Sequence, residues 1–178
     1  MKQSDGVNPK SDSFETFLWN EPVGWNELPT RSPIRILDDW WRHRSGETGK
    51  LPARRDVDPI ELGKAVIPWI FIMAVIRDGD DLDYLYRLVG TANAQLVGRD
   101  ATGMLASDIF RGKDRAVIKA SFDETVEARK PTYWRAAIPH EQEFSVSVYR
   151  AIYPLSDKGE TIDHLIAAAI PESVHLER

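Results

Sequence analysis

Two stretches of the chain constrain its fold more than any other part. Residues 84–103, YLYRLVGTANAQLVGRDATG, pass from alternating strand residues into a short helical pattern and then reach a turn bounded by glycine. Residues 153–169 read as a strand, a turn and a second strand. Strands that alternate with short helices and end in an antiparallel pair are typical of the α+β class.

The middle of the chain predicts a hairpin ahead of the short helices. Residues 67–76 are rich in Ile, Val, Phe and Trp, which is typical of a strand buried on both faces. The acidic turn at 78–81 then leads into the returning strand at 84–89. This turn lacks the ligand spacing of a calcium loop, because Leu82 stands where the next oxygen ligand is needed.

A longer helix and three strands complete the predicted sheet. The helix begins at Lys113 or Asp114 and runs to about Ala128, and Pro131 prevents its continuation. The strands that follow are predicted at 132–138, 143–155 and 161–170, with turns at 139–141 and 156–159. We therefore expect a five-stranded antiparallel sheet with short helices on one face.

A helix is predicted before the sheet. Ser32 is a suitable N-cap, Pro33 suits the first helical position, and Gly46 is expected to end the helix. Its broad apolar face covers either the chain's own sheet or a second subunit, and the sequence leaves both open. A second helix begins at Asp58-Pro59, where Glu61 stands close to the position of a capping box.

The N-terminal arm combines a polar start with dense aromatic residues. Residues 1–13 are predicted to be disordered, whereas Phe14, Phe17, Leu18, Trp19 and Trp25 form a strap on the same domain or an arm that binds a partner. Because monomers seldom expose so much apolar surface, a homodimer is expected. The candidate residues for a dimer or partner interface are Ile34, Leu37, Trp40, Trp41 and Trp19.

Composition excludes several classes of function. The 178 residues suit one domain with extensions, and a net charge of -5 gives no electrostatic affinity for nucleic acid or an anionic membrane. The absence of cysteine excludes disulfides, thiolate metal sites and cysteine-linked flavin adducts. No histidine has the spacing of a metal site, so no metal is expected, and haem ligation by His164 is an unfavoured alternative. With no signal peptide or membrane-spanning run, a cytoplasmic location is expected.

Four motifs in order carry a resemblance to a known family. The segments LPARRDVDPIEL, YRLVGT, GRDATG and PLSDKGE resemble the PAS-domain superfamily, and more specifically a bacterial subfamily of stand-alone PAS proteins with an N-terminal helical extension. The resemblance covers about residues 34–171. Gly90 stands where many PAS domains have Asn, and Val97 replaces the usual aromatic residue.

The resemblance implies a domain division and a function. It implies an arm at 1–31, a helical extension at 32–65, a PAS domain at 66–171 and a tail at 172–178. A PAS domain of this kind is expected to be a sensory or regulatory module, not an enzyme, that binds a small ligand or a signalling protein partner. The alternatives are a ligand-free docking scaffold and a small enzyme on a cone-shaped α+β fold. No catalytic residue and no cofactor is assigned.

The same resemblance implies a pocket between the sheet and the short helices. Pockets are mostly apolar with a few placed polar groups, and an arginine in the wall would suit a carboxylate or a phosphate. Strand alternation divides the late strands into two sets, and the sequence does not say which set faces the pocket. The candidate pocket residues are Arg87, Gly90, Ala92, Asn93, Leu96, Trp134, Arg135, Tyr149 and Arg150.

Overall fold

The computed structural model describes residues 19–140 and 144–176. Within them, six strands form one antiparallel sheet in the order β1-β4-β5-β6-β2-β3. The α+β class and the antiparallel sheet are therefore confirmed, with one strand more than predicted. The strands are β1 (Trp19–Pro22), β2 (Ile70–Asp78), β3 (Asp81–Val89), β4 (Thr132–His140), β5 (Phe144–Leu155) and β6 (His164–Pro171).

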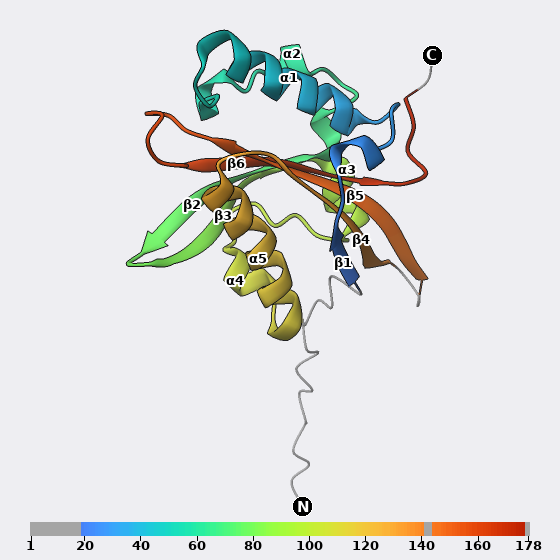
Figure 1. The fold of residues 1–178 in the computed structure, drawn as a ribbon. Coiled ribbons are helices and arrows are strands. Elements are labelled where there is room, and N and C mark those ends of the chain that lie inside the picture. The colour runs from blue at the N-terminus through green and yellow to red at the C-terminus, as the bar shows by residue number, and fades with distance from the viewer. Residues whose placement is uncertain (1–18, 141–143, 177–178) are drawn as a thin grey trace, which may run out of the picture.

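Helices cover both faces of the sheet. Figure 1 shows α1 and α2 on one face, called here the outer face, and α4 and α5 on the opposite, inner face. The α-helices are α1 (Pro33–Thr48), α2 (Pro59–Leu62), α3 (Thr91–Leu96), α4 (Ala106–Ile109) and α5 (Gly112–Ala128). Short 3₁₀ turns lie at η1 (Trp25–Glu27), η2 (Arg54–Asp56) and η3 (Ile67–Trp69).

The sixth strand, β1, comes from the predicted arm. It pairs antiparallel with β4, with Trp19 opposite Ala137 and Pro22 opposite Trp134. This pairing supplies backbone hydrogen-bond partners to an edge of the sheet that would otherwise be open. The predictions for residues 1–13, Phe14, Phe17, Leu18 and the turn residue Glu141 lie outside the described residues.

The first helix begins as predicted and ends later. Ser32 Oγ accepts a hydrogen bond from the Ile34 amide at 3.3 Å, and Pro33 is the first helical residue. The predicted end at Gly46 is wrong, because the helix continues to Thr48 and ends at Gly49, whose φ of +63° is left-handed. A glycine inside a helix costs only about 1 kcal/mol relative to alanine, so Gly46 does not stop the helix.

The second helix has the predicted cap but no complete capping box. Asp58 Oδ1 accepts from the Ile60 amide at 2.8 Å. Glu61 turns away from the cap and accepts from Arg44 Nη2 at 2.6 Å, which ties α2 to α1.

The apolar face of α1 packs on the chain's own sheet, which answers the question that the sequence left open. Ile34 and Leu37 are fully buried, and the Trp41 indole donates to the Pro154 carbonyl at 2.9 Å. This outer core is formed by α1, α2 and outward residues of the sheet. Its main members are Leu28, Ile34, Leu37, Trp40, Trp41, Leu62, Val66, Ile70, Ile72, Ala151, Tyr153, Leu155, Ile166, Ala168 and Ile170.

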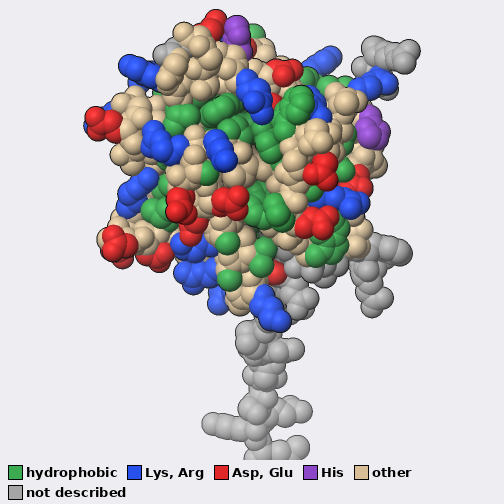
Figure 2. Space-filling model, in the orientation of Figure 1, with side chains coloured by type: hydrophobic (Ala, Val, Ile, Leu, Met, Phe, Trp, Pro, Cys, Tyr) green, Lys and Arg blue, Asp and Glu red, His purple; other side chains and the backbone are tan. Residues whose placement is uncertain are grey.

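The surface carries charges of both signs. Figure 2 shows Lys and Arg interspersed with Asp and Glu on the visible face, without a field of one sign. Within the described ranges, no helix has the length and hydrophobicity that crossing a membrane requires.

Candidate ligand-binding site

The inner face of the sheet borders a cavity of about 90 Å³. The other walls come from α3, the loop after it, α4 and α5. A volume of this size holds several water molecules or a small organic ligand. The lining residues are Phe71, Tyr86, Val89, Asn93, Leu96, Val97, Arg99, Ala101, Ile109, Phe110, Ile118, Ile138, Val148, Arg150 and Ala169.

Strand alternation builds the sheet side of this wall. Val148 and Arg150 are two residues apart on β5 and therefore point to the same face. Arg150 lies opposite Trp134 on β4 and opposite Ala169 on β6. The alternate residue, Tyr149, packs with the outer core. The strand residues that alternate with Tyr149, among them Val148 and Arg150, are therefore the ones that line the cavity.

Arg150 is a charged side chain in the interior. It is only 2% exposed, and it donates to Asn20 Oδ1 at 3.1 Å and to Ser121 Oγ at 3.4 Å. Its guanidinium carbon lies 5.9 Å from the centre of the Phe122 ring. Burial lowers the pKa of Arg150 to about 10, so the group stays protonated at neutral pH. One cation thus connects the cavity wall to β1 and α5.

The start of α3 is fixed by close backbone contact. A Cβ at Gly90 would lie 2.4 Å from the Pro68 carbonyl oxygen and 2.6 Å from that of Ile67. Asn93 Nδ2 donates to the Trp69 carbonyl oxygen. These contacts hold α3 against η3, and they place Asn93 and Leu96 at the cavity.

Only some of the predicted pocket residues line the cavity. Asn93, Leu96 and Arg150 line the cavity. Gly90, Ala92 and Trp134 do not line it. Gly90 is in contact with η3, and Trp134 packs in the hydrophobic core on the inner face of the sheet.

Three other candidates lie elsewhere. Arg135 is on the outer face, where its Nε donates to Glu172 Oε1 at 2.5 Å, and Tyr149 packs against the outer core. Arg87 is exposed and lies where the register of β2 and β3 shifts, between the pairs Ile72–Leu88 and Met73–Tyr86.

The sequence reasoning missed most of the apolar wall. Phe71 on β2 and Tyr86 on β3 stack with ring centres 5.8 Å apart, and Ile118 of α5 also lines the cavity. The strand alternation that assigns Val148 and Arg150 to one face would also have assigned Phe71 and Met73 to one face. The identity of that face still depends on where the helices pack.

Most of the candidate interface residues are buried in the chain itself. Ile34, Leu37, Trp40 and Trp41 belong to the outer core. Trp19 is 37% exposed at the edge of the sheet, where the Arg135 guanidinium lies 5.4 Å from its ring centre. The expected apolar surface of α1 is therefore covered within the molecule.

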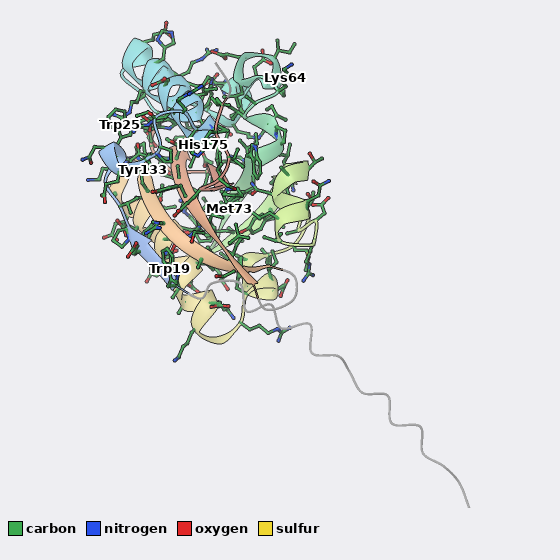
Figure 3. All side chains as sticks on the ribbon, turned by 90° about the vertical axis from the view of Figure 1, so that its right-hand side faces the viewer. Trp19, Trp25, Lys64, Met73, Tyr133 and His175 are labelled. Carbon is green, nitrogen blue, oxygen red and sulfur yellow. The ribbon has the colours of Figure 1, made fainter. Side chains whose placement is uncertain are left out.

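A second buried polar group joins α1 to the outer face. Asp38 is fully buried and accepts from Trp25 Nε1 at 2.7 Å, from Arg42 Nε at 2.5 Å and from the Tyr133 hydroxyl. Burial and then the hydrogen bond to Asp38 raise the pKa of Tyr133 above its ordinary range. Figure 3 shows Trp25 and Tyr133 on the same side of the molecule, with Trp19 farther along the edge. This cluster connects η1, α1 and β4.

The part of the chain that the structure describes holds no group of three or more His, Asp or Glu side chains arranged for a metal ion. His164 lies on β6 opposite Leu155 of the outer core, so it is on the face away from the cavity. Burial lowers its pKa. This position gives no support to the alternative of haem ligation inside the pocket.

Comparison with known proteins matches this arrangement to a family. A family model described as PAS domain matches residues 19–168. The chain belongs to the PAS domain family. The match begins at β1 and ends within β6, so it includes α1 and α2 as well as the sheet. A search of curated proteins found no match. PAS domains are typically sensory rather than catalytic and commonly mediate protein interactions and dimerisation.

Proposed function

We propose that this PAS domain binds a small molecule in the inner cavity. Binding of the ligand changes the surface of the domain and thereby its affinity for a protein partner. The observation that carries the proposal is the position of Arg150, a buried cation that lines the cavity and also bonds to β1 and α5. A cavity filled by its own side chains, as in a ligand-free docking scaffold, would leave no volume of this size next to Arg150.

The route from the cavity to the surface is short. An occupant that engages Arg150 competes with Asn20 for the same guanidinium and changes the free energy of pairing between β1 and β4. A ligand can shift such an equilibrium only by its difference in affinity for the two states. β1 is four residues long and lies at the edge of the sheet, so its pairing is the part most easily shifted.

The first test is a thermal-shift screen of a metabolite library on the wild-type chain and on Ala169→Phe. Ala169 lines the cavity opposite Arg150, so the phenyl ring should fill the ligand's place. Compounds that raise the melting temperature of the wild type by several degrees are expected to lose this effect in Ala169→Phe. Ala120→Phe is the matched control, because Ala120 is exposed on α5. Stabilisation that survives Ala169→Phe would place the ligand outside the cavity.

The second test measures whether ligand binding changes the pairing of β1 with β4. Hydrogen exchange of the Trp19–Pro22 amides is expected to change at least several-fold when a hit from the screen is added, because the ligand alters the Arg150–Asn20 bond. Asn20→Ala should keep the thermal shift and lose this change in exchange. Sedimentation velocity on the same samples tests whether the partner is a second copy of the chain. Equal exchange with and without ligand would refute the route through β1.

A further inference from the structure

We propose that the occupant of the cavity is a small monocarboxylate with an apolar body, held by the Arg150 guanidinium. This inference rests on the proposed function and names the chemical class of its ligand. Three observations support it: the charge of the lining residues, their low polarity and the small volume of the cavity.

The charge of the wall selects an anion. Among the described residues that line the cavity are two arginines, Arg99 and Arg150, and no acidic side chain. A cation in an apolar interior gains most from an anion placed directly against it, because the effective dielectric constant there is low.

The geometry of guanidinium favours a carboxylate among anions. Its planar fork of N–H donors matches the two oxygens of a carboxylate. A phosphate monoester would carry up to two charges and three acceptor oxygens into this wall. Apart from the arginines, only Asn93 and Tyr86 offer polar side chains among the lining residues, so a second charge would be poorly solvated.

The other lining residues favour a ligand whose remaining part is small and apolar. Phe71, Val89, Ile109, Ile118 and Val148 present aliphatic and aromatic surface to the cavity. A volume of about 90 Å³ is too small for a nucleotide or a tetrapyrrole without rearrangement of the core. A short aliphatic or aromatic acid places its tail on these side chains and its carboxylate on Arg150.

The experiment compares three ligands with six carbon atoms each, whose head groups are an anion, a neutral amide and a cation. Binding of hexanoate, hexanamide and hexylammonium is measured by isothermal titration calorimetry on the wild type, Arg150→Met and Arg150→Lys. Hexanoate is expected to bind the wild type at least tenfold more tightly than hexanamide, and hexylammonium is expected not to bind. Arg150→Met should remove the preference for hexanoate over hexanamide, and Arg150→Lys should retain part of it.

The matched control is Arg135→Met. Arg135 lies on the adjacent strand but faces outward and pairs with Glu172, so its loss should leave the preference unchanged. Binding of hexanamide to Arg150→Met shows that the variant keeps its cavity. If that variant does not fold, Arg150→Lys supplies the comparison, and an unchanged preference in it overturns the assignment to the guanidinium fork.

Each remaining outcome is decisive. Equal or tighter binding of hexanamide or hexylammonium by the wild type overturns the carboxylate class while leaving a ligand-binding cavity. A preference for hexanoate that survives Arg150→Met refutes Arg150 as its origin. Absence of binding by all three compounds overturns this inference, and the metabolite screen with Ala169→Phe then decides separately whether the cavity binds any ligand.

Discussion

Replacing Gly90 by alanine is expected to lower the free energy of unfolding by about 3 kcal/mol, the upper end of the usual cost of overpacking. The backbone of Gly90 has φ of -64°, so an alanine there is not conformationally strained. Its added methyl group would instead meet the carbonyl oxygens of Pro68 and Ile67 at 2.4 and 2.6 Å. Both are backbone atoms, so relief requires η3 and α3 to separate.

Gly46→Ala is the matched control for this prediction. Gly46 is exposed inside α1 with no atom within 4 Å of an added Cβ, so alanine should stabilise the chain by up to about 1 kcal/mol. Urea denaturation of the two variants and the wild type measures both effects. A Gly90→Ala protein as stable as the wild type would show that η3 and α3 do not pack as described.

Replacing Asp38 by alanine is expected to lower the free energy of unfolding by about 3 kcal/mol. The carboxylate is fully buried, and its loss removes the acceptor for Trp25, Arg42 and Tyr133 together. The half-buried Tyr133 hydroxyl would then lose this acceptor. The same contacts join η1, α1 and β4, so the variant should also loosen α1 from the outer face.

Asp39→Ala serves as the comparison, because Asp39 is the exposed neighbour on the same helix. Its effect should stay within about 0.5 kcal/mol. Urea denaturation gives the two free energies, and hydrogen exchange along α1 gives the local effect. If both substitutions cost the same, the buried cluster does not hold the helix to the sheet.

The sheet could be predicted from sequence because its strands carry local signals. The strands at Ile70–Asp78, Thr132–His140 and Phe144–Leu155 are rich in β-branched and aromatic residues. The last strand, His164–Pro171, is an apolar run of Ala, Ile and Leu that follows the turn at Gly159. β1 could not be predicted in the same way. Its four residues, WNEP, have no alternation and include a proline, and only the pairing with β4 makes them a strand.

The pocket was only partly predictable for a different reason. Alternation separates Arg150 from Tyr149, but both sets on β5 contain apolar residues, so the pattern alone does not identify the inner face. The helices decide this, because Tyr149 packs against the core that contains α1, whereas Arg150 donates to Ser121 of α5. Gly90 was predicted to line the pocket, whereas its missing side chain makes room for the backbone of η3.

The face of α1 illustrates the same limit. A stripe of Ile34, Leu37 and Trp41 predicts that something covers the helix, and it does not distinguish the chain's own sheet from a second subunit. The distinction comes from tertiary contacts such as the Trp41 indole bond to Pro154 on β5.

A crystal structure of the purified chain grown with hexanoate would test most directly whether the PAS fold encloses a ligand site at Arg150. Density for one molecule is expected among Phe71, Ile118 and Val148, with the carboxylate against the Arg150 guanidinium. A collapsed interior, with side chains filling the space beside Arg150 and no density for hexanoate, would contradict it.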